Sequence, residues 1–336
     1  MSKTVKTIPV LMDCDPGHDD AIALVMAHRS PVIDLLGVTT VCGNAPPERT
    51  TSNALIDLLG VTTVCGNAPP ERTTSNALRI MQFIDATDVP VAQGCVTPLA
   101  RPLVLGTADG PTGLDGTTYL PEATMPLVPM HGVDFIAKIL REAPEPVVLV
   151  PTGPLTNIAM FLLKYPELKH KIDKIVLMGG AFYRRTEYIT PTEFNIFCDP
   201  EAARIVLDSG LDIIMVGLDV TMHVLVEEEQ FAELRKIESP LGKVVLDWLK
   251  FYEKLHRGQM GVGGALHDPL ALAVVIDPTL IETREAHVEI DLTGTYTFGA
   301  TVADFWNERK LGNNTRIATR VDSGRFFELM YSLLRD

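Results

Sequence analysis

Four aspartates lie within eight residues near the start of the chain. The segment reads DCDPGHDD, covers residues 13–20 and separates an apolar run from a segment of helical spacing. Carboxylates so close together repel one another unless a cation binds between them, and oxygen ligands favour Ca²⁺ or Mg²⁺ over zinc. Asp19 and Asp20 alone would be ordinary in the first turn of a helix, where the helix dipole stabilises acidic side chains. Asp13 and Asp15 follow an otherwise apolar strand, so that explanation does not cover them and we expect a metal site.

The elements that position these residues alternate along the chain. Short apolar runs, such as residues 8–15, 146–153 and 174–180, are separated by longer segments of helical spacing, such as residues 131–143. Strands that are apolar at consecutive positions are typical of a sheet covered on both faces. We therefore predict an α/β protein with an open, mainly parallel sheet flanked by helices and a Rossmann-like core. Polar residues follow the apolar runs, so the active site is expected at the carboxyl ends of the strands.

One segment of the chain occurs twice. Residues 33–55, IDLLGVTTVCGNAPPERTTSNAL, are repeated without a single change as residues 56–78. Old repeats diverge, and a solenoid needs at least about three units, so we interpret this as a recent or artificial duplication. No Gly/Ser-rich or charged linker divides the chain. We expect residues 1–336 to form a single domain, with a natural length of 336 − 23 = 313 residues.

Composition excludes several classes of partner. The formal charge of −14 would repel a phosphate backbone, and no run of Lys or Arg offsets it, so nucleic acid is not expected as a partner. No stretch approaches the roughly 18 to 20 apolar residues that span a bilayer, and the first residues lack a secretory signal, so we expect a cytoplasmic protein without a membrane partner. The five cysteines are dispersed and form no CxxC pair, which indicates reduced thiols.

The aspartate segment and a series of later motifs resemble the inosine-uridine preferring nucleoside hydrolase family. DCDPGHDD is similar to the amino-terminal signature of that family, and the later motifs follow in the family's order. They are GNAPPERTTSNAL after the second strand, PTGLDG at 111–116, VPTGPLTNIA at 150–159, VLMGGA at 176–181, EFNIFCDPEAA at 193–203, GLDVT at 217–221 and LHDPLALA at 266–273. The resemblance implies a nucleoside hydrolase fold and hydrolysis of the N-glycosidic bond of small-molecule ribonucleosides, in a homodimer or homotetramer.

The resemblance also implies a calcium site and a catalytic base. Calcium would be held by Asp15, Asp20, the backbone carbonyl of Thr152 and Asp268, with Asp13 supporting the network. Asp15 would also be the general base, accepting a proton from a water molecule held by the Ca²⁺. The sugar would then develop oxocarbenium character, as in glycoside hydrolysis generally.

Further residues are implied to bind the substrate. The ribose would be held by Asp19, Asn44 or Asn67, Met178, Glu193 and Asn195, and His267 would protonate the leaving base. Taken alone, a single Asn after a strand is more often a turn residue, and His267 could equally be a packed core histidine. EFN could be surface polarity, and DPEAA could be a helix start with Pro in its first turn.

Two departures from the family concern specificity. The family usually has His at the position of Asp109, and residues 187–193 lack a Gly-Asn pair and one further residue of the family's pattern. Purine-specific relatives stack tryptophans on the base, whereas Trp248 and Trp306 are far in sequence from PTGLDG. We therefore expect uridine, cytidine and inosine as substrates.

Two other functions fit parts of the pattern. A Mg²⁺-dependent phosphohydrolase of the haloacid-dehalogenase type also has a DxD motif after its first strand, but its separate Lys and downstream acidic pair have no counterpart here. A calcium-dependent nucleoside or ribose sensor could share the fold without catalysis.

The duplication offers two copies of one strand, one Gly-Asn loop and one helix. The helical segment ERTTSNALRIMQFI begins in the second copy and continues beyond it. We therefore expect the first copy to be displaced between Val32 and Ile56, so that Asn67 rather than Asn44 serves the site. A longer connection costs only about 0.6 kcal/mol per doubling of its length.

Overall fold

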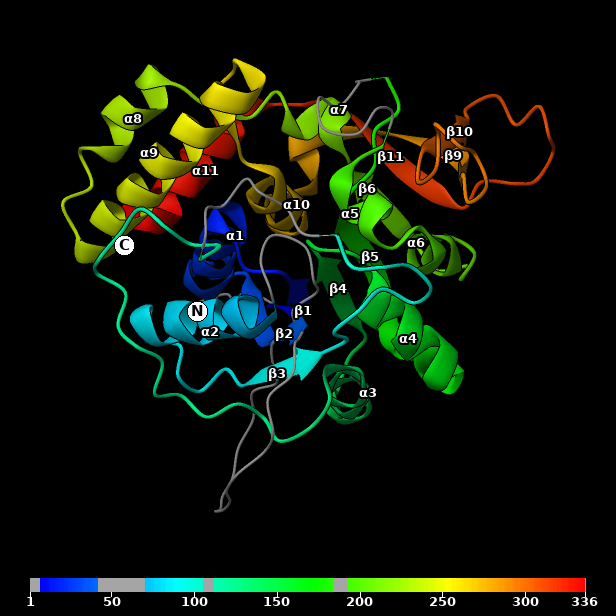
Figure 1. The fold of residues 1–336 in the computed structure, drawn as a ribbon, viewed down its shortest axis with the longest axis horizontal. Coiled ribbons are helices and arrows are strands. Elements are labelled where there is room, and N and C mark those ends of the chain that lie inside the picture. The colour runs from blue at the N-terminus through cyan, green and yellow to red at the C-terminus, as the bar shows by residue number, and fades with distance from the viewer. Residues whose placement is uncertain (1–6, 42–69, 105–111, 184–191, 336) are drawn as a thin grey trace, which may run out of the picture.

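The computed structural model describes residues 7–41, 70–104, 112–183 and 192–335. Its central feature is a nine-stranded sheet of order β10-β9-β11-β6-β5-β4-β1-β2-β3 (Figure 1). Seven neighbouring strands, from β11 to β3, are parallel, and β9 and β10 join antiparallel at one edge. The predicted open, mainly parallel sheet is confirmed. The strands are β1 Ile8–Cys14, β2 Ile33–Val41, β3 Val91–Gly94, β4 Val147–Pro151, β5 Ile172–Met178, β6 Ile213–Val216, β9 Ile281–Ile290, β10 Thr301–Asp304 and β11 Thr315–Val321, with β7 Leu225–Val226 and β8 Gly264–Ala265 as a separate pair.

Helices cover both faces of the sheet (Figure 1). Along β1, Val10 and Met12 point into one hydrophobic core and Leu11 points into the other, so consecutive apolar residues are buried on opposite faces. The core that contains Val10 is covered by α1, α2 and α8–α11, and the other by α3, α4 and α6. The helices are α1 His18–Arg29, α2 Pro70–Phe83, α3 Gly132–Glu142, α4 Thr156–Lys164, α5 Phe194–Cys198, α6 Pro200–Leu207, α7 Leu218–Thr221, α8 Glu228–Leu234, α9 Pro240–Met260, α10 His267–Ile276 and α11 Ser323–Arg335.

Local sequence signals explain where the helices begin and end. Helix α9 starts after Ser239, whose hydroxyl accepts the Gly242 N–H, and has Pro240 at its first position. It ends at Gly261, whose φ of 73° suits a residue without a Cβ atom. Helix α10 is apolar on nearly all sides and is buried beside α1. Within the described residues, no helix has an apolar stretch long enough to cross a membrane.

Each copy of the duplicated segment contributes one element to the described fold. Strand β2 comes from the first copy and pairs with β1 and β3, whereas α2 begins in the second copy. The expectation that the first copy is displaced between Val32 and Ile56 is therefore wrong for its strand.

The physical reason lies in the connections. Removing any 23-residue window of the repeat leaves the same sequence, so the chain can retain every short connection. Ile33 donates to the Ser30 carbonyl at 3.4 Å and Ile8 to the Val32 carbonyl at 2.8 Å, which joins α1 to β2 by a tight turn. The added length falls instead between β2 and α2, within residues 42–69, which lie outside the described residues.

Candidate functional site

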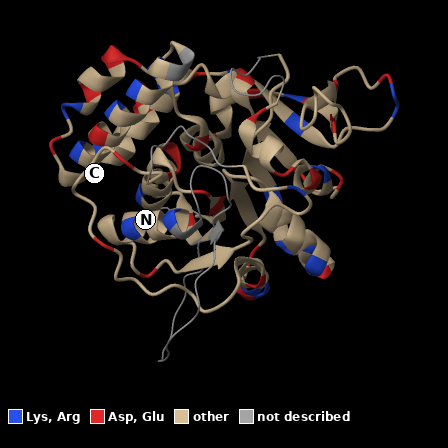
Figure 2. Ribbon diagram, in the orientation of Figure 1, with Lys and Arg blue, Asp and Glu red and all other residues tan. Residues whose placement is uncertain are grey.

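The acidic cluster predicted from the sequence lies where two buried helices begin. Helix α1 follows β1 and packs against α10, and carboxylates from the first turns of both helices form one group; Figure 2 marks Asp and Glu along the ribbon in red. Carboxylate oxygens of Asp19, Asp20 and Asp268 all lie within 4.8 Å of one another, and all three residues are buried. This places residues 19–20 and 268, which are distant in sequence, in one group at the carboxyl end of the sheet.

The electrostatics of this cluster fit a bound cation. Burial raises the pKa of Asp268 well above its ordinary value, and the negative charges of Asp19, Asp20 and Asp15 raise it further. The thiol of Cys14 behaves in the same way, because burial raises its pKa well above normal and the nearby aspartates add to the shift. A group of buried carboxylate oxygens that disfavours additional negative charge is the donor set that hard divalent cations prefer.

Asp15 is almost fully buried beside this group. Its charge acts on Asp268, so these two carboxylates lie near each other, while oxygens of Asp19, Asp20 and Asp268 lie within 4.8 Å of one another. Asp19, which the family resemblance assigned to a ribose hydroxyl, is thus also close enough to hold a cation.

Thr152 links the acidic cluster to the end of β1. Its hydroxyl donates to Asp20 Oδ1 at 2.7 Å, and its N–H donates to the Asp13 carbonyl at 2.8 Å. Its own carbonyl accepts a hydrogen bond from Asn195 Nδ2 at 2.7 Å. A carbonyl oxygen has two lone pairs, so the same atom can also serve as a metal ligand.

Asp13 lies near the end of β1, and its carboxylate accepts hydrogen bonds from two neighbouring elements. Its Oδ1 accepts the Thr39 hydroxyl at 3.0 Å and Asn157 Nδ2 at 2.8 Å. Asn157 is oriented in turn because its Oδ1 accepts the Cys95 N–H at 2.8 Å. These contacts come from the neighbouring strand β2 and from α4, and they agree with a supporting role for Asp13.

Glu193, Asn195 and Met178 form a second part of the site. Glu193 begins α5, where Oε1 accepts the Asn195 N–H at 2.8 Å and Oε2 accepts the Ile196 and Gly180 N–H groups at 3.1 and 3.2 Å. Burial raises the pKa of Glu193, and the backbone N–H groups partly offset that shift. Asn195 Nδ2 also contacts the carbonyl and the sulfur of Met178 at 3.3 Å. All three side chains are buried, so EFN is not surface polarity.

The DPEAA motif is a helix start with Pro in its first turn, as one interpretation of the sequence held. Asp199 begins α6, where its Oδ1 accepts the Ala202 N–H at 3.1 Å and Pro200 takes the first helical position. Its other oxygen, Oδ2, accepts the Thr156 hydroxyl at 2.7 Å and the Leu99 N–H at 2.9 Å, which fixes the loop after β3.

His267 is half-buried at the start of α10, immediately before Asp268. Its Nδ1 lies 2.7 Å from the Thr221 hydroxyl. The His267 ring also lies 6.1 Å from that of His256, and Tyr252 follows at 4.4 Å from His256. The imidazole is thus partly exposed, next to other rings and adjacent in sequence to Asp268 of the acidic cluster.

Sequence reasoning missed several residues that hold the site together. His18 Nε2 contacts the Asp115 carbonyl at 2.6 Å, and its ring stacks on Phe251 and Tyr252. Asn76 donates to the carbonyls of Pro16 and Thr112, at 3.2 and 3.1 Å. His18 lies inside the DCDPGHDD motif and Asp115 inside PTGLDG, so their motifs were visible, but their contact was not.

The structure places both tryptophans, but several of the predicted residues lie outside the part of the chain that it describes. Trp248 is buried in the hydrophobic core on α9, next to Asp247, whose carbonyl approaches Gly116 of PTGLDG, and Trp306 is 72% exposed after the edge strand β10. Asn44, Asn67, Asp109 and residues 187–191 lie outside the described residues.

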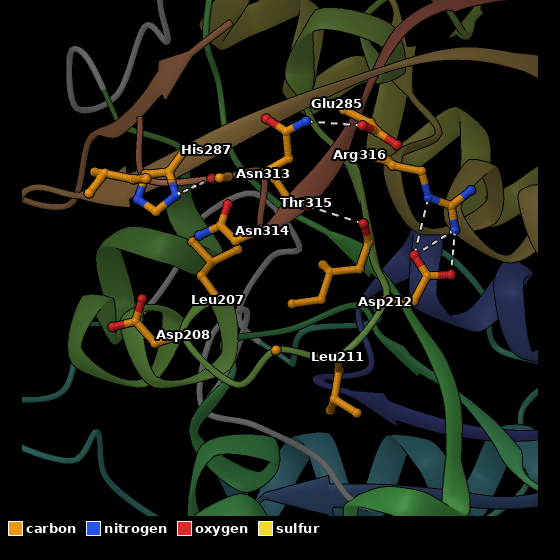
Figure 3. A pocket seen from close by; sticks show the side chains of 14 residues that line it. Leu207, Asp208, Leu211, Asp212, Glu285, His287, Asn313, Asn314, Thr315 and Arg316 are labelled. Carbon is orange, nitrogen blue, oxygen red and sulfur yellow. Dashed lines mark hydrogen bonds and ion pairs between the residues drawn. The ribbon is translucent and has the colours of Figure 1, made fainter. Parts of the chain in front are cut away.

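A separate cavity of about 530 Å³ lies at the opposite ends of β6 and β11 (Figure 3). Two pairs of its polar side chains interact with each other: Arg316 with Asp212 at 2.6 Å, and Asn313 with Glu285 at 3.0 Å. It is distant from the acidic cluster, because the strands run between them, and it does not provide the chemistry described above.

Comparison with known proteins gives a consistent family match. The family model described as inosine-uridine preferring nucleoside hydrolase matches residues 10–56 and 55–328, and the two matched segments meet at the boundary between the copies of the repeat. A pyrimidine-specific ribonucleoside hydrolase RihA of Photobacterium profundum is 42% identical over 325 residues, 96% of this chain and 97% of that protein. An Escherichia coli O7:K1 protein of the same description is 38% identical over 331 residues, 98% of each chain.

Solved structures agree over nearly the full length. A purine-preferring ribonucleoside hydrolase from Gardnerella vaginalis has a TM-score of 0.82 at 30% identity, covering 97% of this chain and 99% of that one. A plant nucleoside hydrolase has a TM-score of 0.83 at 27% identity, covering 98% and 99%.

Proposed function

Because the chain belongs to the inosine-uridine preferring nucleoside hydrolase family, we propose that its acidic cluster binds Ca²⁺ and that Asp15 is the general base. The protein is a nucleoside N-ribohydrolase, which cuts the bond between ribose and nucleobase with water, rather than a phosphohydrolase or a sensor. The observation that carries the proposal is the buried group of Asp19, Asp20 and Asp268 beside Asp15.

The ligands that we assign are Asp15, Asp20, Asp268 and the Thr152 carbonyl. When bound, Ca²⁺ would neutralise the repulsion among these carboxylates and polarise the attacking water. Asp15 would accept the proton that this water loses as its oxygen bonds to the anomeric carbon of the ribose. Asp13, anchored by Thr39 and Asn157, would hold the end of β1 in place.

The ribose would be held by residues on the two sides of the cluster. Asp19, Glu193 and Asn195 supply carboxylate and amide groups for its hydroxyls, Met178 contacts its face, and Asn44 or Asn67 completes the set. Groups fixed in advance by hydrogen bonds, as Glu193 is by three N–H groups, stabilise the growing positive charge without reorganising.

The leaving base would receive its proton from His267. As the bond between carbon and base nitrogen breaks, its electron pair passes to the base, and a proton from the imidazole neutralises it. The relatives named as pyrimidine-specific support uridine and cytidine as substrates, and we retain inosine on the basis of the histidine. Measuring the free base released from a panel of nucleosides tests this assignment, and nucleoside 5′-monophosphates in the panel test whether nucleotides are also cleaved.

The test of the central proposal is Asp15→Asn. The substitution keeps the size of the side chain but removes its basic oxygen, so turnover should fall by about 100- to 10,000-fold. Asp173→Asn, on an exposed position outside the site, is the matched control and should retain full turnover. Thermal melting of both variants checks folding, and product formation with excess EDTA or with added calcium tests the cation. Near-normal turnover of Asp15→Asn would remove it from the base role.

A further inference from the structure

The GLDVT motif, residues 217–221, has no part in the reaction described so far. It forms the single-turn helix α7 directly after β6 and contacts α10. Its two ends meet different parts of the site, because Thr221 reaches His267 and Leu218 and Asp219 reach the segment after β5.

The first contact fixes the imidazole of His267. Thr221 is fully buried, and its hydroxyl lies 2.7 Å from His267 Nδ1. A hydrogen bond at Nδ1 commits that nitrogen to the protein and restricts rotation of the ring. The imidazole can then meet a substrate only through Nε2.

The second contact fixes the segment that follows Met178. The Asp219 carboxylate accepts the Phe182 N–H at 2.7 Å and the Tyr183 N–H at 2.9 Å, one on each oxygen. Leu218 N–H donates to the Gly180 carbonyl at 2.9 Å. A Cβ atom at Gly217 would lie 2.4 Å from that carbonyl oxygen, so the close approach requires glycine here.

The same segment, residues 180–183, also contacts Glu193, one of the residues assigned to the ribose. The Gly180 N–H donates to Glu193 Oε2 at 3.2 Å. A continuous set of hydrogen bonds therefore runs from Glu193 through Gly180 and α7 to His267.

We propose that α7 is a positioning element that sets the base end and the ribose end of the site from one turn of helix. Thr221 is a positioning residue for His267, and Asp219 is a positioning residue for the segment that carries the Gly180 N–H. The inference concerning Thr221 rests on the proposed role of His267 toward the leaving base.

The test compares uridine with p-nitrophenyl riboside, whose leaving group departs without a proton. Thr221→Val keeps the shape of the side chain but removes its hydroxyl, and should lower kcat/KM for uridine about 10- to 100-fold, the loss that removing the hydrogen-bond partner of a metal-ligating histidine typically causes. Its kcat/KM for p-nitrophenyl riboside should stay unchanged, and Thr221→Ser should restore uridine hydrolysis. Both substrates are measured on one sample, so the ratio does not depend on the folded fraction.

The outcomes separate this inference from the proposed function. Equal losses on both substrates in His267→Ala would refute the leaving-group role itself. A selective loss in His267→Ala with no selective loss in Thr221→Val would refute the positioning role of Thr221 alone, as would equal losses on both substrates in Thr221→Val. In the double variant, Thr221→Val should add nothing to His267→Ala.

Asp219→Asn tests the other end of α7. The carboxamide retains one acceptor but presents an NH₂ group to the second backbone N–H. Because both substrates share the ribose, KM should rise by a similar factor for uridine and for p-nitrophenyl riboside. An unchanged KM for both substrates, or a loss confined to uridine, would overturn the role assigned to Asp219.

Discussion

Removing one copy of the duplicated segment should stabilise the protein without harming its fold. Deleting residues 33–55 or 56–78 gives the same chain of 336 − 23 = 313 residues. In the structure, β2 ends at Val41 and α2 begins at Pro70, so 28 residues connect them and 28 − 23 = 5 would remain. Both elements that flank the connection are kept by the deletion.

The size of the effect follows from the entropy of closing the connection. Shortening it from 28 to 5 residues lowers the closure cost by (3/2)RT ln(28/5), or about 1.5 kcal/mol. With an unfolding entropy of roughly 2.1 cal/mol/K per residue, that gain raises the melting temperature by roughly 2 °C. The deletion also removes a second apolar strand segment, VTTV, for which the sheet has no place between β1 and β3, so aggregation should decrease.

Thermal melting and light scattering of the two chains measure both effects. A third chain, in which residues 42–64 are replaced by a Gly/Ser segment of equal length, separates the length of the connection from its sequence. It should melt like the duplicated chain but aggregate like the shortened one. A lower melting temperature after the deletion would show that the second copy stabilises the fold, and the closure argument would be wrong.

Three further outcomes are expected. In the absence of a cation, Asp268→Asn should raise the melting temperature, because it relieves repulsion in the acidic cluster. It should also lower turnover by more than roughly 100-fold, because losing a metal ligand should cost more than losing a residue that only hydrogen-bonds to a ligand. Thermal melting with and without calcium checks the first effect, and steady-state kinetics check the second. Asn157→Ala should cost about 2 to 3 kcal/mol in urea unfolding, because Asp13 loses a buried donor; a cost below 1 kcal/mol would contradict the supporting role. Because the strand in the sheet comes from the first copy, Asn44→Ala should now lower hydrolysis more than Asn67→Ala, the reverse of the expectation from the sequence, and equal partial losses would indicate that the two copies exchange.

The fold and the acidic core of the site could be predicted because their signals are local. Apolar runs identified β1, β4 and β5, and the order of aspartates in DCDPGHDD placed carboxylates at the end of a strand and the start of a helix. The family resemblance added Asp268, which no spacing argument could have connected to residues 19–20.

The contacts that fix the site could not be predicted, because they depend on strand order. Asn157 reaches Asp13 across 144 positions because β4 lies beside β1, and Thr39 reaches it from the other neighbour, β2. The copies of the repeat pose a similar limit. Their sequences are identical, so no periodicity shows which copy supplies the strand of the sheet. The short turn between α1 and β2 is kept only when the strand of the first copy pairs with β1.

The charges around the cluster explain why a divalent cation, rather than the protein alone, should complete it. Helices α1 and α10 both begin at the acidic residues, and each helix start contributes about half a positive charge. Together they offset about one of the four negative charges that Asp15, Asp19, Asp20 and Asp268 carry when ionised. Roughly three negative charges would remain for other groups or a cation to balance in a buried space, where burial first and then repulsion by the neighbouring aspartates raise the pKa of Asp268. A monovalent ion would leave about two of them, whereas Ca²⁺ would leave about one, so calcium should stabilise the fold far more than sodium at equal occupancy.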